Sequence, residues 1–321
     1  MQAFITGGSG FIGGHLARRL VRDGWRVRVL VHNTEIEAND IETIPGEIRN
    51  VALLKTGLKG VDVLFHLASA LGASRIGKSE FFGINAEGTR AVLSAAREAG
   101  VSKIIHFSSA GVLGHVPRRE IAGEDSPVSP RDVYDKSKLE GEKIALECAR
   151  RGQNISVIRP GWVYGPGDRR TLKLIRAVAR KKFILVSRGK IFQTPVFIDD
   201  LIQGTLLCAE KGRPGEIYHL AGPEVLTVND IVRKIAAATD SRIPRFSFPR
   251  PPVRAAAWLL GKTFSLAKRE APLSPSRLAF FIHPKPLAIE KAARELGYAP
   301  EWDFERGIAA AVAWYRSNGW L

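Results

Sequence analysis

The sequence predicts an α/β fold in which a doubly wound parallel sheet is followed by a smaller C-terminal lobe. Short, mostly apolar runs alternate with segments of helical periodicity, and this rhythm loosens beyond about Gly161. Alternating strands and helices are typical of a parallel sheet. Its strands need long crossovers, and the intervening segments are long enough to supply them.

The elements follow in a regular order. The predicted strands are Ala3–Thr6, Arg26–Val31, Val61–Ala68, Lys103–Ser108 and Asn154–Arg159. Helical periodicity lies between them at Phe11–Asp23, Phe82–Ala99 and Tyr134–Arg151. Residues 161–167 are loop-like, and residues 247–268 mix proline, arginine and apolar side chains, which indicates a second lobe.

The first turn carries the first chemical signal. Thr6-Gly7-Gly8-Ser9-Gly10-Phe11-Ile12-Gly13 follows a strand and opens a helix. Glycines in such a loop let the backbone turn sharply and approach a pyrophosphate at the helix N-terminus. In this context the loop predicts a Rossmann-type dinucleotide site. Its expected cofactor-binding residues are Gly7, Gly10, Phe11, Ile12 and Gly13.

The end of the second strand bears on the choice between NAD and NADP. An Asp or Glu there would hydrogen-bond the adenosine ribose and favour NAD. The chain instead has His32, Asn33 and Thr34, with no acid before Glu35. A 2′-phosphate is then tolerated, and protonated His32 could help to neutralise it. The sequence therefore favours NADP and leaves NAD open, while His32 could equally cap the strand in solvent.

A second signal is Tyr134-Asp135-Lys136-Ser137-Lys138. Tyr134 and Lys138 are four residues apart and share one face of a helix. A free phenol has a pKa of about 10, and a nearby ammonium would lower it and make the tyrosine a usable acid and base. The strand one crossover earlier ends in Ser108-Ser109, at the sheet edge where such folds bind ligands.

With these motifs the chain resembles the extended short-chain dehydrogenase/reductase family, also called the NAD-dependent epimerase/dehydratases. The likeness covers nearly the whole chain and includes His66-Leu67-Ala68-Ser69 and the stretches 85–89, 159–166, 197–201, 219–222 and 295–300. It implies that Ser109 is the catalytic serine, that Tyr134 moves the proton and that Lys138 also holds the nicotinamide ribose. It implies further cofactor contacts at Glu47, Ile48, Leu67, Ala68, Pro160 and Val163.

Departures from the family pattern indicate a subgroup. Ala110 and Gly111 follow Ser109 where dehydratases of the family carry an acidic pair, so dehydration is not expected. Trp162 stands where nucleotide-sugar enzymes usually have Asn, and Leu113 replaces a usual Tyr, so we expect a less polar substrate site. The pattern resembles the branch of 3β-hydroxysteroid or sterol dehydrogenases, dihydroflavonol-type reductases and hopanoid-associated epimerases.

We expect two parts in the chain of 321 residues. Residues 1–160, with about 190–222 returning to them, would form the NAD(P)-binding Rossmann domain. Residues 161–189 and 223–321 would form the substrate-binding lobe. The resemblance also implies a homodimer through the helices near Thr89–Ala99 and Tyr134–Arg151.

The chain is strongly basic, with 48 Lys and Arg against 32 acids and a formal net charge of +16. Such a field attracts anions, but the basic residues are scattered and no nucleic-acid-binding motif accompanies them, so no nucleic-acid partner is expected. Four basic residues could either grip a substrate phosphate or face solvent, namely Arg169, Arg170, Lys173 and Arg176.

Residues 251–269 predict a basic amphipathic helix. Its apolar stripe at helical spacing comprises Val253, Ala256, Ala257, Leu260 and Phe264, and its basic flanks comprise Arg254, Lys262, Lys268 and Arg269. Such a helix could rest on anionic lipid, form a lid over an apolar substrate, or pack its stripe on the second lobe.

Compartment and metal content follow from simpler features. Cys148 and Cys208 suggest no disulfide framework, and the longest apolar runs are far too short to span a bilayer. A strand begins at Gln2 with no signal peptide before it, so we expect a cytoplasmic protein. The seven histidines show no ligand spacing, and no metal is expected.

Three functions stay open. The first is an NAD(P)-dependent oxidoreductase acting on a small, rather apolar alcohol or ketone. The second is a nucleotide-sugar epimerase, in which the same hydride leaves and returns to the other face. The third is a non-catalytic dinucleotide-binding scaffold or sensor, against which the complete Ser109, Tyr134 and Lys138 set argues.

Overall fold

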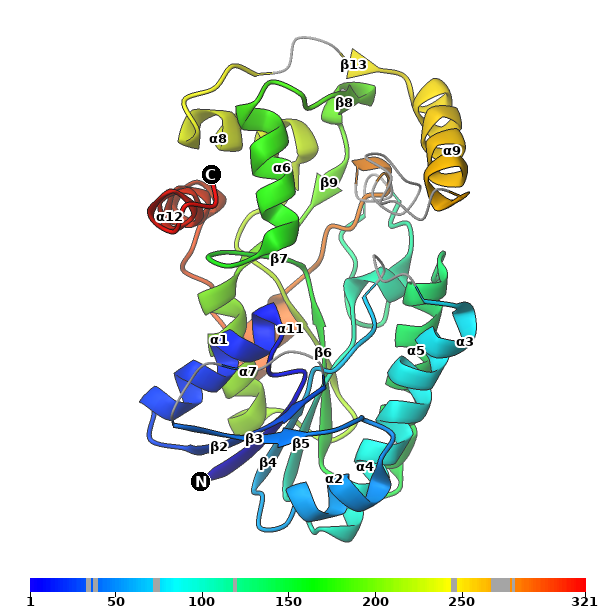
Figure 1. Ribbon diagram of the computed structural model, residues 1–321, viewed down its shortest axis with the longest axis vertical. Coiled ribbons are helices and arrows are strands. Elements are labelled where there is room, and N and C mark those ends of the chain that lie inside the picture. The colour runs from blue at the N-terminus through cyan, green and yellow to red at the C-terminus, as the bar shows by residue number, and fades with distance from the viewer. Residues whose placement is uncertain are drawn as a thin grey trace.

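A computed structural model describes residues 1–32, 36, 40–71, 76–117, 120–243, 247–266, 278 and 281–321, with only the backbone for 261–266. A seven-stranded, wholly parallel sheet in the order β11-β6-β5-β4-β1-β2-β3 forms its centre (Figure 1). The strands are β1 Gln2–Thr6, β2 Arg26–Val31, β3 Ile41–Pro45, β4 Val63–His66, β5 Lys103–Phe107, β6 Ile155–Pro160 and β11 Ile217–Leu220. The predicted fold class is confirmed.

Helices cover both faces of this sheet (Figure 1). One face carries α1 Phe11–Arg22 and α7 Ile198–Lys211, and the other carries α2 Val51–Gly57, α4 Gly88–Glu98 and α5 Val133–Arg150. Every residue of β4 and β5 is buried as a result. This is why the central strands are mostly apolar and do not alternate between apolar and polar residues.

Two parts of this sheet region differ from the sequence prediction. Strand β3 was missed because it is an edge strand in which only Ile41 is buried, so its apolar signal is weak. The helix expected at Phe82–Ala99 begins earlier, with α3 Lys78–Phe82, and is interrupted by a π-helical turn at Gly83–Glu87. Helix α5 packs closely there, because a Cβ on Gly141 would lie 2.2 Å from the Asn85 carbonyl oxygen.

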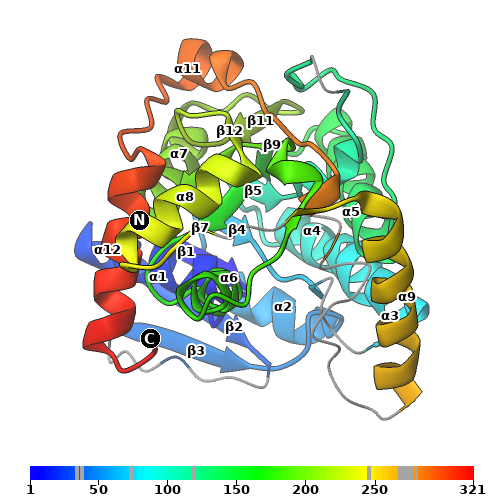
Figure 2. The ribbon, with the colours of Figure 1, turned by 90° about the horizontal axis from the view of Figure 1, so that it is seen from above.

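Most of the rest of the chain builds a lobe from short strand pairs and helices (Figure 2). The pairs are β7 Trp162–Tyr164 with β10 Pro195–Phe197, β8 Leu185–Val186 with β13 Ser247–Phe248, and β9 Phe192–Gln193 with β12 Leu226–Thr227. The helices of the lobe are α6 Arg169–Ala179, α8 Val228–Ala238, α9 Arg250–Leu266 and α12 Phe304–Ser317, whereas α11 Glu290–Leu296 packs beside α7 and β11 of the sheet region (Figure 1). In the described part of the chain, none of the helices has the length and hydropathy of a membrane span.

Candidate active site

The site begins where the strand order reverses, between β1 and β4. The loops that follow these two strands lie side by side, because Leu67 N donates to the Thr6 carbonyl oxygen at 3.0 Å and Ala68 N donates to Thr6 Oγ1 at 3.2 Å. In doubly wound sheets, ligands bind at such a reversal, beyond the carboxyl ends of the strands. The glycine loop and the residues after β4 are therefore brought together at a ligand-binding edge.

The glycine loop is packed so closely that side chains would not fit. Gly7 has a φ of +74°, and a Cβ on it would lie 2.7 Å from Ala68 N. A Cβ on Gly13 would lie 2.3 Å from the Gly7 carbonyl oxygen. Gly10 caps α1 without a side chain, and the first turn of α1 has no acid. The N-terminus of α1 thus fits a phosphate group.

A cavity of about 230 Å³ adjoins this loop. Five of the predicted cofactor residues line it, namely Gly7, His32, Glu47, Ile48 and Ala68. Further residues, which were not among the predicted cofactor contacts, also line it: Ser9, Leu30, Gly46, Arg49, Ser69, Ala70, Glu80 and Ile84. Because the cavity lies beyond the ends of β1, β2 and β4, it fits the adenosine half of a dinucleotide.

The charged side chains around this cavity differ from those that the sequence predicts at the end of the second strand. His32 Nε2 lies 3.6 Å from Glu47 Oε1, and Arg49 contacts both Glu47 at 3.4 Å and Glu80 at 3.1 Å. The strand end that lacks an acid in sequence therefore has one nearby in space. The missed strand β3 explains this, because its Pro45 pairs with Val31 and so carries Glu47 toward His32. Asn33, Thr34 and Glu35 lie outside the described residues.

The other predicted cofactor residues surround the loop without lining the cavity. Phe11 and Ile12 are half-buried in the first turn of α1, and Leu67 is half-buried after β4. Pro160 ends β6, and Val163 is buried in β7. Strand β6 adjoins β5, so Pro160 lies on the same edge as Ser109, and Val163 follows three residues later in the chain.

The predicted catalytic side chains gather at the carboxyl end of β5. Ser109 follows this strand, and its side chain acts on the phenol of Tyr134 in the direction that lowers the pKa of the phenol. Tyr134 lies in the first turn of α5, which Asp132 caps by accepting from Asp135 N at 2.8 Å. Lys138 is one turn further along and donates from Nζ to the Phe107 carbonyl oxygen at 2.5 Å. All three side chains therefore meet at one end of one strand.

The pKa of Tyr134 is shifted in the opposite direction from the one that the sequence predicts. Burial raises the pKa of Tyr134 above the ordinary value of a phenol. The guanidinium of Arg170, rather than the ammonium of Lys138, is the main charge that lowers this pKa. The predicted lowering by Lys138 is wrong for this structure, since removal of water from the phenol outweighs the nearby cations. Tyr134 is therefore a protonated phenol at neutral pH.

Glu142, a buried carboxylate that the sequence analysis did not single out, interacts electrostatically with Lys138. Burial lowers the pKa of Lys138 to about 8, and Glu142, one turn along α5, raises it. Glu142 accepts two hydrogen bonds from Arg159 of β6, at 2.6 and 2.9 Å, and both side chains are almost fully buried. The spacing of Glu142, four residues after Lys138, was the signal available in the sequence.

A buried polar network lies near Lys138. His66 contacts Thr6 Oγ1 through Nδ1 at 2.7 Å and Thr89 Oγ1 through Nε2 at 2.9 Å. Burial and the charge of Lys138 lower the pKa of His66 to about 3, so the ring is neutral. Asn85 joins the ends of two elements by bonding both Ala70 and Ser137. These groups hold the strand ends at the site in place.

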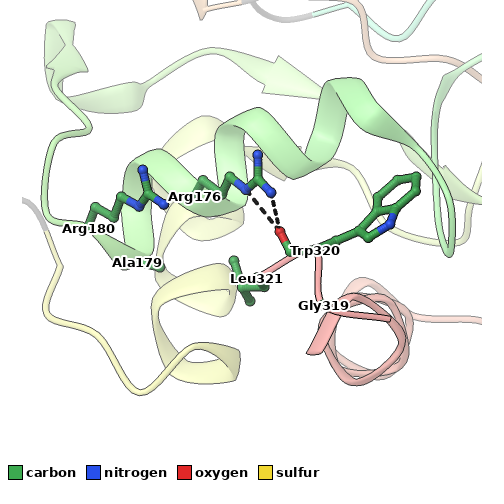
Figure 3. Close-up of a pocket in the computed structure, with 6 residues that line it drawn as sticks. All are labelled: Arg176, Ala179, Arg180, Gly319, Trp320 and Leu321. Carbon is green, nitrogen blue, oxygen red and sulfur yellow. Dashed lines mark hydrogen bonds between the residues drawn. The ribbon is translucent and has the colours of Figure 1, made fainter. Parts of the chain in front are cut away.

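The basic residues of α6 do not form one cluster. Arg170 acts on Tyr134, whereas Arg169 lies over the Trp320 ring at 5.2 Å. Arg176 donates two hydrogen bonds to the Trp320 carbonyl oxygen and lines a separate cavity of about 360 Å³ (Figure 3). None of the predicted catalytic residues lines that cavity. Arg170 is thus linked to the predicted catalytic side chains, whereas Arg169 and Arg176 contact Trp320.

Leu113 and Trp162, which led us to predict a less polar substrate site, have different surroundings from those that the prediction assumed. Leu113 is buried in a cluster with Val112 and Leu287, so it makes the layer beneath Ser109 apolar instead of presenting surface to a substrate. Trp162 is half-buried, with its ring 5.9 Å from that of Phe304, and part of it belongs to the aromatic core of the lobe. Within the described ranges, no group of three or more His, Cys, Asp or Glu could hold a metal ion.

The chain is similar to known proteins over its whole length. The model of the NAD dependent epimerase/dehydratase family matches residues 3–221. A relative from Stigmatella aurantiaca, 4-hydroxy-2-methyl-3-oxo-4-farnesyl-3,4-dihydroquinoline-1-oxide ketoreductase, is 31% identical over 97% of this chain and 95% of its own. The sterol-4-alpha-carboxylate 3-dehydrogenase, decarboxylating, of Mus musculus is 28% identical over 96% of this chain and 89% of its own.

A solved structure has the same fold. The dTDP-glucose 4,6-dehydratase DesIV from Streptomyces venezuelae, with NAD and TYD bound, superimposes with a TM-score of 0.80. The two chains are 26% identical, and the match covers 100% of this chain and 98% of that one.

Proposed function

The chain belongs to the NAD dependent epimerase/dehydratase family, as its motifs predict, and is an NAD(P)-dependent oxidoreductase. From this premise we propose that it transfers hydride between nicotinamide and the carbonyl or hydroxyl carbon of a small, rather apolar substrate. The observation that carries the proposal is the convergence of Ser109, Tyr134 and buried Lys138 at the end of β5, where Lys138 Nζ donates to the Phe107 carbonyl oxygen at 2.5 Å.

The close-packed glycine loop and the cavity beside it support dinucleotide binding. The backbone at Gly7 and the start of α1 would hold the pyrophosphate, and Ile48 with Ala68 would contact the adenosine half. Lys138 would hold the nicotinamide ribose. When bound, the nicotinamide supplies the hydride acceptor or donor.

Tyr134 and Ser109 would act on the oxygen of the reacting carbon. Because burial raises the pKa of Tyr134, its phenol is protonated at neutral pH and ready to donate a proton to a carbonyl oxygen. Ser109 would donate a hydrogen bond to that same oxygen and stabilise the charge that develops there. A neutral phenol favours the reduction of a ketone, since no prior ionisation of Tyr134 is needed.

The names of two relatives support an apolar substrate. One is a ketoreductase of a farnesyl-bearing quinoline oxide, and the other is a dehydrogenase of a sterol carboxylate.

One observation favours a second candidate, a nucleotide-sugar epimerase. The side chain of Arg170 is 60% exposed, and its guanidinium lowers the pKa of Tyr134. The same guanidinium could contact a substrate phosphate. An epimerase regenerates its own cofactor, whereas a reductase consumes it.

The test is therefore consumption of added cofactor. We expect the purified protein to oxidise NADPH or NADH in the presence of apolar ketones, with no net change in cofactor when UDP-glucose is the substrate. Thermal unfolding with NAD, NADP and UDP-glucose identifies which ligand binds the folded state. Stabilisation by UDP-glucose, with no ketone consumed, would favour the epimerase.

We also propose that the protein is a cytoplasmic homodimer. Helices α4 and α5 lie side by side on one face of the sheet, where two copies could form a four-helix interface (Figure 1). Cys148 and Cys208 are both free thiols, as is usual in a reducing compartment. Light scattering at several protein concentrations tests the dimer.

A further inference from the structure

Helix α9 is apolar on two opposite faces. Val253 and Ala257 face inward and pack in a cluster with Val186. Trp258 and Leu259 face outward, with exposed fractions of 55% and 58%. A helix that is apolar all round is normally buried, yet α9 lies at the outer edge of the molecule in both views (Figures 1 and 2). Its outward side chains need a different explanation from the inward ones.

The apolar stripe that the sequence predicts on α9 packs against the rest of the molecule only in part. Val253 and Ala257 are inward as expected, and Leu260 is half-buried, but Ala256 is exposed. The side chains of Lys262 and Phe264, and all of Lys268 and Arg269, lie outside the described residues. The structure adds a face that the sequence did not indicate.

We define the outer face of α9 as Pro251, Ala255, Trp258 and Leu259, which share one side of the helix by their spacing and are all exposed. Exposed Arg254 borders this face. The sequence of α9, from Arg250 to Leu266, contains no acidic residue. An apolar face on a helix whose own sequence has basic but no acidic residues is typical of helices that lie in a lipid interface.

We propose that α9 rests on an anionic lipid surface through this outer face. The Trp258 ring suits the headgroup level of a bilayer, and Leu259 suits the boundary with the acyl chains. Arg254 and the net charge of +16 attract anionic headgroups over the Debye length. This interaction goes beyond the proposed enzymatic function.

A second copy of the chain fits the outer face less well. A stable protein interface buries about 800 Å² on each partner, far more than two large and two small side chains provide. Two copies of α9 packed through this face would also bring like charges together at Arg254. A lipid surface needs only a few inserted side chains together with charge attraction, and so it matches what α9 offers.

The chain segment beside the start of α9 also approaches the predicted catalytic residues. Arg250, the first residue of α9, acts on His283, and two residues after His283 the side chain of Lys285 acts on Asp135, which directly follows Tyr134. A lipid-bound α9 would hold the reacting groups near the membrane, where an apolar substrate dissolves. This last step rests on the proposed function, whereas lipid binding itself does not.

Vesicle sedimentation of the full-length protein tests the proposal. We expect binding to vesicles of equal parts phosphatidylcholine and phosphatidylserine, and much less binding to phosphatidylcholine alone. The double substitution Trp258→Ser with Leu259→Ser should weaken the binding by about tenfold or more, because two apolar side chains no longer leave water. Arg254→Glu should weaken it by about fivefold or more.

The matched control is Val51→Ser in α2, which removes an apolar side chain that is 39% exposed at the opposite end of the molecule (Figure 1). Its binding should equal that of the wild type. The proposal is overturned if wild type does not sediment with the mixed vesicles, or if the double variant sediments as well as wild type. A double variant that changes only the oligomeric state in light scattering would identify a second copy as the occupant and also overturn it.

Failure here is distinguishable from failure of the proposed function. Consumption of NADPH or NADH with a water-soluble short-chain ketone is measured on the same preparations without vesicles. We expect the double variant to retain this turnover, because its substituted side chains lie outside the catalytic set.

Discussion

The two ends of the candidate site differ in how deeply their ionisable side chains are buried. At the catalytic end, the side chains of Glu142 and Arg159 are 2% and 3% exposed and joined by two hydrogen bonds. At the adenosine end, the side chains of His32 and Glu47 are 60% and 54% exposed and 3.6 Å apart. A buried pair is expensive to break, whereas an exposed pair is screened by water and salt.

This difference separates what the fold determines from what a single surface substitution can change. The reacting groups are fixed by packing between α5, β5 and β6, so substitutions there should cost activity or stability steeply. Cofactor preference depends on exposed side chains and should respond in small steps. Five measurements can break or sharpen this contrast.

Tyr134→Phe should have the largest effect. It removes the phenolic proton while keeping the ring, so kcat should fall by about 10²–10⁴-fold, the usual contribution of general acid–base catalysis. Cofactor affinity should change little, because the adenosine cavity lies elsewhere. Steady-state kinetics and calorimetric titration with cofactor measure the two quantities. Turnover near that of wild type would remove Tyr134 from the mechanism.

Glu142→Gln should destabilise the fold by about 3–5 kcal/mol, because Arg159 would remain buried without its counter-charge. The matched control is Glu147→Gln on the same helix. Its partner Arg151 is 70% exposed, and the loss should stay below about 1 kcal/mol. Urea denaturation measures both. Equal losses in the two variants would show that burial does not distinguish these pairs.

The contrast also explains how far sequence reasoning reached. Ser109 and Tyr134 could be identified because each lies at the end of a regular element, directly after β5 and in the first turn of α5. Their meeting follows from strand order alone. The Glu142–Arg159 pair joins a helix to a strand, and nothing local in the sequence specifies such a partner.

At the adenosine end the missing information was an edge strand. Because β3 has little buried apolar surface, its pairing with β2, and hence the approach of Glu47 to His32, had no periodic signal. The pKa of Tyr134 was misjudged for a related reason, since burial is a property of the whole fold. Local spacing predicted the ammonium but could not predict the loss of water.

Gly13→Ala tests whether the cofactor end depends on backbone packing. A Cβ there would lie 2.3 Å from the Gly7 carbonyl oxygen, and neither backbone segment can yield cheaply. We expect cofactor affinity to fall by about tenfold or more, as overpacking of this kind usually costs. Gly14→Ala is the control, because its Cβ would meet the Gly8 carbonyl oxygen at an ordinary 3.5 Å. Equal affinities in the two variants would contradict the packing argument.

The pH dependence of kcat/KM tests the buried lysine. With a pKa of about 8, Lys138 loses its ammonium as the pH rises through that value, so kcat/KM should fall by about tenfold per pH unit above it. Lys136→Gln, an exposed position on the same helix, should leave the profile unchanged. Stability should rise with pH between about 8 and 10.5, because the unfolded chain then binds the additional proton. A flat profile across pH 8 would contradict this role.

Glu47→Gln should have the smallest effect of the five measurements. It tests the adenosine end of the site, where the His32–Glu47 pair is exposed. The substitution removes a negative charge 3.6 Å from the His32 ring and 3.4 Å from the Arg49 guanidinium, so both side chains become more available to a 2′-phosphate. Because exposed charges contribute about 0.2–1 kcal/mol, the ratio of kcat/KM for NADPH to that for NADH should rise by only a few-fold. The same ratio, measured at low and high salt, should converge as screening increases.

Glu87→Gln provides the control, since Glu87 pairs with Arg90 on the surface and does not line the adenosine cavity. It removes an equal charge and should leave the cofactor ratio unchanged. A shift of the same size in both variants would mean that net charge, rather than the position of Glu47, governs cofactor choice. A tenfold or larger shift for Glu47→Gln alone would mean that the exposed end is as strongly coupled as the buried one, and the contrast between the two ends would not hold.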